Sequence, residues 1–113
     1  MPFPEADPLS PSFQETSSAA VAQGSAGTTS IVTGVSGKQI YVTFVSLTLD
    51  AAGTLKFTET AGDLSGAMAI ASNGGIVAGN GARAVLWTTT AGEDLKITTT
   101  TGAAAGWVNY YVA

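Results

Sequence analysis

The chain of 113 residues contains no cysteine and no histidine. Without cysteine it can form no disulfide and no thiolate metal site, and the redox compartment cannot be inferred. Without histidine it lacks both the commonest general base and the commonest metal ligand. Serine and threonine are abundant, but a serine nucleophile would lack its usual base. We therefore expect no enzymatic activity, no cofactor and no metal.

Charge is also scarce. Charged residues make up 11% of the chain, against about 25% in an average soluble domain. The net charge is −4, and the four basic residues are scattered along the chain: Lys38, Lys56, Arg83 and Lys96. Nucleic-acid binders need clustered Lys and Arg, so no nucleic-acid partner is expected. A surface with so little charge favours a protein whose faces are covered in an assembly over a free monomer.

Long apolar runs are missing as well. No run approaches the roughly 18 residues of a membrane-spanning helix, so we expect no membrane partner. The first residues, MPFPE, contain neither a basic region nor a hydrophobic run of a signal peptide. We expect synthesis in the cytoplasm, which the protein would leave only as part of a larger assembly.

Proline is confined to the first eleven residues, after which Gly, Ala, Thr and Val dominate. Proline favours extended backbone and cannot donate to a β-ladder. We therefore divide the chain into an extended N-terminal arm, 1–17, and one β domain, 18–113. The arm carries apolar anchors that we expect to dock on another protein surface or a neighbouring subunit: Phe3, Leu9, Pro11 and Phe13. A disordered tail is the alternative.

The domain has the pattern of an all-β protein. Residues 38–50 form the strongest predicted strand, with a change of phase at Phe44–Val45 that indicates a bulge or bend. Further strands are predicted at 28–33, 54–60, 83–90, 93–101 and 106–112, with Leu64, Met68 and Ile70 on another. About eight short antiparallel strands at this spacing predict a β-sandwich or jelly roll.

Two glycine-rich segments are interpreted as connections. Residues 73–81 (NGGIVAGNG) contain two Asn-Gly turn signals and are predicted to be a flexible loop, which could also let a neighbouring backbone approach closely. Residues 34–39 (GVSGKQ) have the wrong spacing for a phosphate-binding loop and lead into a strand. We interpret them as a hairpin turn.

The acidic residues offer little chemistry. Asp50, Glu59 and Asp63 lie at strand ends and turns, where carboxylates are usually solvated, so a hydrolase using them is a remote alternative. Glu93 and Asp94 are adjacent on a predicted strand and point to opposite faces, which makes them a poor metal pair.

Aromatic residues gather in the last strand. Trp107 and Tyr111 share one face with Asn109, whereas Tyr110 shares the other with two valines. Large side chains on both faces mean either a central strand or an outer face covered by a partner, so Trp107 and Tyr111 are the candidate subunit interface. Carbohydrate stacking on Trp87 or Trp107 is the less favoured alternative.

Five strings carry a resemblance to a known family: 35–42 (VSGKQIYV), 53–57 (GTLKF), 64–68 (LSGAM), 89–97 (TTAGEDLKI) and 106–110 (GWVNY). Together they resemble the small β-sandwich or jelly-roll decoration (cement) proteins of tailed bacteriophage capsids. The resemblance implies a homotrimer on the outside of the virion. Such a trimer would bind the major capsid protein and clamp neighbouring capsomers. The proline-rich arm lies outside the matched region.

The same strings also look like those in phage tail or fibre modules. A carbohydrate- or receptor-binding module of that kind is therefore the alternative function, favoured by the Trp and Tyr residues and by the Asn- and Gly-rich loops.

Overall fold

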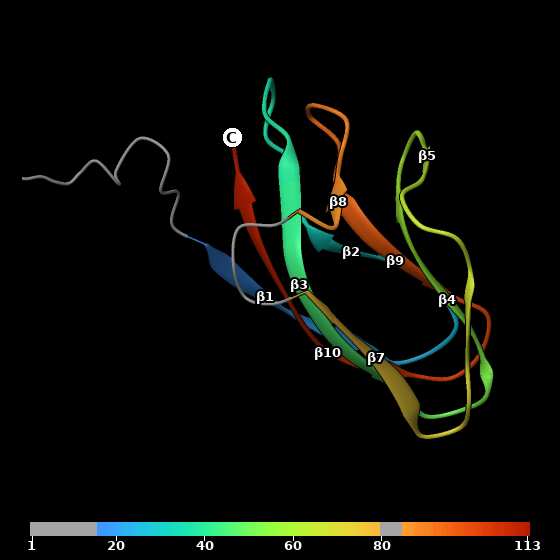
Figure 1. Cartoon of the computed structure of the whole chain (residues 1–113). Helices are drawn as coiled ribbons and strands as arrows, with labels where there is room; N and C mark the ends of the chain where they lie inside the picture. The colour runs from blue at the N-terminus through green and yellow to red at the C-terminus, as the bar shows by residue number, and fades with distance from the viewer. Residues whose placement is uncertain (1–15, 80–84) are drawn as a thin grey trace, which may run out of the picture.

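The computed structural model describes residues 16–79 and 85–113. In these ranges it contains ten strands and no helix, arranged as two antiparallel sheets that face each other (Figure 1). The predicted all-β sandwich is confirmed, with two more strands than the eight expected. None of the described residues forms a helix long and apolar enough to cross a membrane.

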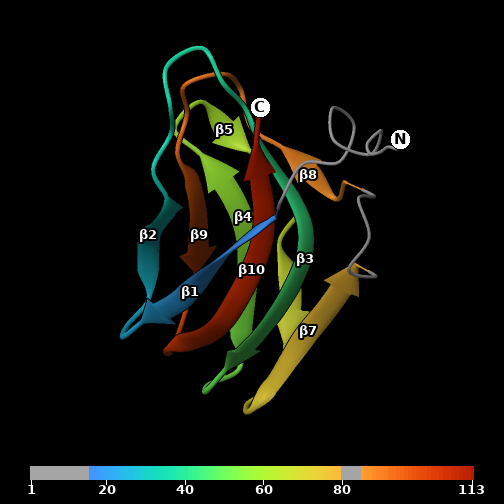
Figure 2. The same ribbon diagram turned by 90° about the vertical axis from the view of Figure 1, so that its left-hand side faces the viewer.

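The first sheet has the order β1-β10-β3-β7, and β8 pairs with β3 on the same side as β7, further along the strand (Figure 2). The strands are β1 (Ser17–Gln23), β3 (Ile40–Leu49), β7 (Gly74–Gly79), β8 (Trp87–Thr88) and β10 (Ala104–Val112). The two longest, β3 and β10, lie side by side at its centre. The last strand, β10, is therefore central in its sheet, which is one of the two alternatives that its aromatic residues left open.

The second sheet has the order β2-β9-β4-β5, and β6 pairs with β4. Its strands are β2 (Gly27–Val32), β4 (Gly53–Glu59), β5 (Gly62–Asp63), β6 (Met68–Ile70) and β9 (Leu95–Thr99). Because β2 and β3 belong to different sheets, the segment between them is not the hairpin turn we predicted. It contains a turn closed by a hydrogen bond from the Lys38 N–H to the Val35 carbonyl, 3.0 Å, and crosses from one sheet to the other.

The core lies between the sheets and follows from strand alternation. Val45, Leu47 and Leu49 point inward from β3 and are at most 2% exposed. From β4, Phe57 is fully buried and its ring stacks on Trp87, 4.5 Å between centroids. This contact assigns Trp87 to the core and leaves Trp107 as the exposed tryptophan of the chain.

A bulge lies in the middle of β3. Asn109 of β10 pairs with Phe44 and Tyr110 pairs with Val42, so Thr43 is the extra residue. Val42 and Val45 are both fully buried, although residues three apart on a regular strand point to opposite faces. The predicted change of phase is confirmed, one residue earlier than the sequence indicated.

The segment predicted as a flexible loop at 73–81 contains strand β7, so that prediction is wrong for 74–79. The Asn73–Gly74 turn signal is correct: Asn73 has φ 60° and the Gly74 N–H donates to the Ala71 carbonyl, 2.8 Å. Beyond the turn, glycine is used for close packing. A Cβ on Gly75 would collide with the Leu47 carbonyl oxygen of β3.

Some predictions fall outside the described residues. They concern the arm residues Phe3, Leu9, Pro11 and Phe13, the second Asn-Gly pair at 80–81, and Arg83. The arm boundary itself needs a small correction, because β1 begins at Ser17 rather than after it. Ser17 pairs with Tyr110 and belongs to the sheet.

Candidate interaction surface

The two sheets differ sharply in charge. The five strands of the first sheet contain no charged residue. In the second sheet, Lys56, Glu59, Asp63 and Lys96 all lie on strands. Charged residues are depleted from the centres of protein–protein interfaces, because their desolvation is costly. The outer face of the first sheet is therefore the stronger candidate for a surface that is covered in an assembly.

Four aromatic side chains define this outer face, which we call the aromatic face: Tyr41, Phe44, Trp107 and Tyr111. Tyr41 and Tyr111 are directly opposite across β3 and β10, and their rings stack at 4.8 Å with an interplanar angle of 4°. Phe44 and Trp107 meet at 6.3 Å between centroids. Tyr41, Phe44 and Tyr111 are partly buried, and Trp107 is the exposed ring of the four.

Two apolar side chains of the aromatic face are unusually exposed. Trp107 is 45% exposed and Val77, in the neighbouring row of β7, is 71% exposed. Between them on β3 lies Ser46, which pairs with both. Aromatic residues are enriched in interfaces, where a large rigid ring buries much area for little loss of conformational entropy. The geometry at this point of the sheet thus favours a binding role.

The structure brings the two predicted interface residues together on one face. Trp107 and Tyr111 both belong to the aromatic face, each paired with a ring from β3. Sequence reasoning missed Val77, because 73–81 was interpreted as a loop. The structure identifies it through the alternation of burial along β7, which exposes Gly75, Val77 and Gly79.

The described carboxylates hold loops in place. Asp94 accepts a hydrogen bond from the Gly34 N–H at 2.7 Å and another from Ser30 Oγ at 3.2 Å. The Gly34 bond is the main reason that the pKa of Asp94 falls below its usual value. The Ser30 bond and the nearby Lys96 charge add to the effect, and burial opposes it. Asp94 thus ties the segment after β2 to the start of β9.

Other acids act in the same way. Glu59 accepts from the Thr90 N–H at 2.6 Å and from Thr90 Oγ1 at 2.8 Å. Asp50 accepts from the Ala103 N–H at 2.6 Å. Asp50 precedes β4 and Glu59 ends it, so the two lie at opposite ends of that strand. The three acids considered for a hydrolase are therefore not gathered at one point.

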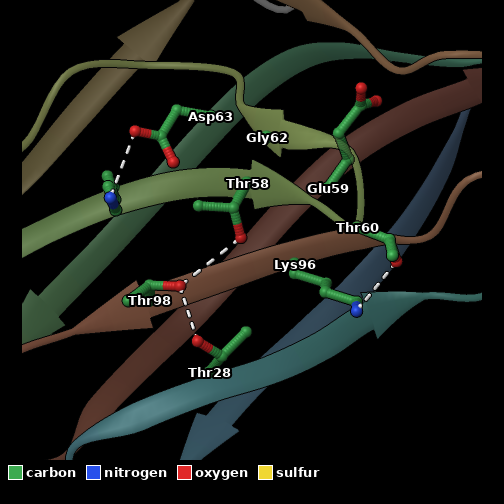
Figure 3. A pocket seen from close by; sticks show the side chains of 9 residues that line it. Thr28, Thr58, Glu59, Thr60, Gly62, Asp63, Lys96 and Thr98 are labelled. Atoms are coloured by element: carbon green, nitrogen blue, oxygen red, sulfur yellow. Dashed lines mark hydrogen bonds and ion pairs between the residues drawn. The ribbon is translucent and has the colours of Figure 1, made fainter.

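A shallow polar hollow of about 360 Å³ lies on the outer face of the second sheet (Figure 3). Within it, Lys56 pairs with Asp63 at 3.1 Å and the Lys96 ammonium donates to Thr60 Oγ1 at 3.0 Å, whereas Glu59 accepts from Thr90 outside the hollow. Thr98 bonds the hydroxyls of Thr28 and Thr58, at 2.8 and 3.4 Å. Since its polar groups largely satisfy one another, the hollow presents few groups to a ligand.

Among residues 16–79 and 85–113, no three acidic side chains gather where they could hold a metal ion. Comparison with known proteins identifies no relationship: no family model, no curated protein and no solved structure matches the chain.

Proposed function

We propose that this chain is a structural virion protein that binds the outer surface of a bacteriophage capsid as an oligomer and strengthens contacts between capsomers. The observation that carries the proposal is the uncharged aromatic face, with Trp107 45% exposed at its centre. The resemblance of five sequence strings to phage decoration proteins supplies the partner, the major capsid protein, and the expected trimer. The jelly-roll class and the extended arm are part of the same proposal.

The proposed mechanism is adhesion without charge. The serines, threonines and asparagine beside the aromatic rings lose little on desolvation if they find hydrogen bonds, whereas buried charges would cost several kcal/mol. Each copy makes a modest contact. Linking copies in an oligomer raises the effective concentration of every further contact, so many weak contacts sum to stable attachment.

The decisive experiment adds purified protein to phage particles that lack it, and images the particles. We expect regular surface protrusions. Trp107→Ala should weaken binding, and Val35→Ala is the matched control, because Val35 has the same 45% exposure but lies in the loop between β2 and β3. The exposed part of Trp107 is about 110 Å², worth about 2–3 kcal/mol when covered, or a loss of roughly 30- to 150-fold in affinity.

Particles that never acquire this protein would overturn the proposal, as would equal binding by the Trp107 and Val35 variants. The contribution of the arm is tested separately by deleting residues 2–15, which leaves the whole of β1 in place. If capsid occupancy is unchanged by this deletion, the arm has no role in docking.

Exposure of Trp107 also favours a second candidate, a carbohydrate- or receptor-binding tail or fibre module. Trp107 lies on the same strand face as Asn109, so a stacking ring and a hydrogen-bonding amide are available to a sugar. Glycan-array binding that is lost in Trp107→Ala and kept in Val35→Ala would favour this function. Binding to particles without any glycan signal would reject it.

A further inference from the structure

Within the described residues, the two outer strands of the first sheet, β1 and β7, have open edges. β1 and β7 each pair on one side only among the described strands, and neither contains a charged residue or a proline. An edge strand presents unpaired N–H and C=O groups, and monomeric proteins usually block such edges with charge, proline, bulges or very short strands. These two edges, of seven and six residues, have none of the four.

The second sheet shows how this protein protects an edge. β2 has an irregular register between Ser30 and Val32, and the Asp94 carboxylate binds Ser30 and the Gly34 N–H beside it. The opposite edge consists of β5, two residues long and carrying Asp63, and β6, three residues long. A bulge, a charge and short strands therefore guard the second sheet, whereas within the described residues β1 and β7 have no such device.

The two open edges match each other in position. Following the pairing across the sheet, Ala20 lies in one row with Trp107, Ser46 and Val77, and Val21 lies in the next row. The rows from Ser18 to Gln23 are the same rows as those from Gly79 to Gly74. A row here is a set of residues directly opposite one another across the four strands. Along a row, hydrogen-bonded and non-hydrogen-bonded pairs alternate in an antiparallel sheet. With four strands, β1 and β7 therefore point their backbone N–H and C=O groups away from the sheet in the same rows.

Direction matches as well. Three antiparallel steps separate β1 from β7, so the two edge strands run in opposite directions (Figure 2). A second copy in the same orientation can thus place its β7 beside β1 as an antiparallel neighbour. Ala20 would face Val77 of the next copy on the aromatic face, and Val21 would face Ile76 towards the core. No like charges meet, which removes the usual obstacle to self-pairing.

We propose that β1 of one copy pairs antiparallel with β7 of the next, and that this head-to-tail pairing closes into a small ring with a continuous aromatic face. Strand addition at an open edge is an established mode of recognition. Strongly twisted open sheets rarely exceed about ten strands without curling. Two to three copies of the four strands β1-β10-β3-β7 reach that size, so the joined sheet is expected to curl and close. The inference rests on the proposed function for its use on a particle and adds the contact that joins the copies.

The absence of cysteine makes a sharp test possible. Ala20→Cys and Val77→Cys are combined in one chain and oxidised gently, and the products are separated without reductant. Within one copy two strands lie between these positions, so their Cα atoms are about 14 Å apart, beyond the roughly 7 Å limit for a disulfide. We expect a covalent ladder that ends at one closed species, with the mass of the oligomer that the unsubstituted chain forms in solution.

The single variants are the controls. Each should stay uncrosslinked, because in the ring Ala20 faces Val77 of the next copy and never another Ala20, so a single variant brings no two cysteines together. Disulfide dimers of Ala20→Cys alone would show β1 pairing with β1, and would overturn the proposal. So would a ladder that grows without limit, an uncrosslinked double variant, or an unsubstituted chain that stays monomeric at its highest soluble concentration.

These readouts need no virus particle. A failed ring therefore leaves the docking test with Trp107→Ala intact, and a failed docking test leaves the ring intact.

Discussion

Replacing Phe57 with alanine tests how the sandwich is held together. Phe57 is fully buried, and its ring stacks on Trp87 at 4.5 Å between centroids. Truncating a buried Phe removes transfer free energy and leaves a cavity, at a cost of about 3–5 kcal/mol. A domain of this size has a free energy of unfolding of roughly 6–17 kcal/mol. We therefore expect the variant to lose a large fraction of its stability, and its Tm to fall by about 12–20 °C.

Phe44→Ala is the matched control. Phe44 undergoes the same change in chemistry, but lies on the aromatic face and is only partly buried. We expect it to cost about 1–2 kcal/mol. Urea unfolding followed by far-UV circular dichroism measures both variants without relying on the fluorescence of Trp87. Equal losses in the two variants, or a larger loss for Phe44→Ala, would refute the assignment of the core to the space between the sheets.

Three further predictions concern single contacts. The pKa of Asp94 is lowered in the folded state. Its stabilising contribution is therefore present above the unfolded pKa of about 3.9 and is lost as the pH falls through the lower folded value. In acid titrations, Asp94→Asn should lose less of its free energy of unfolding below about pH 4 than the unsubstituted chain does. Gly106→Ala should lower the free energy of unfolding by at least about 2 kcal/mol in urea titrations, because φ is +144° and a Cβ would collide with the Ser46 carbonyl. Thr89→Val removes the acceptor of the buried Ile40 N–H, 2.9 Å, and thermal unfolding should report a cost of about 1–3 kcal/mol.

The sequence predicted the features that depend on short-range pattern. Alternation of apolar and polar residues placed β3 and β4 within two residues of their observed ends, and the change of phase in β3 predicted its bulge. These signals are local, since each strand residue faces either the core or solvent according to its position in a period of two.

Features that depend on a neighbouring strand could not be predicted. In β7 the glycines look like loop residues, and the sequence offered a close approach by a neighbouring backbone only as an alternative. The β3 backbone at Gly75 is that neighbour, which no local pattern identifies. The acids that tie loops together are another case. The bond from the Gly34 N–H to Asp94 joins residues 60 positions apart, and no local pattern indicates it.

The candidate site was predicted in part. Trp107 and Tyr111 were identified from crowding in one strand, but their partners Phe44 and Tyr41 come from β3, which required knowledge of the pairing. Val77 joined them only when β7 was seen to be a strand.

The bulge in β3 limits how this chain can change in evolution. Because Thr43 is an inserted residue, its deletion would move every residue of β3 on one side of it by one place relative to β10. Ile40 and Val42 would then turn from the core towards solvent while Tyr41 turned inward. Descendants of this sequence can lengthen or shorten the turns between strands, but β3 has a residue count that selection must preserve.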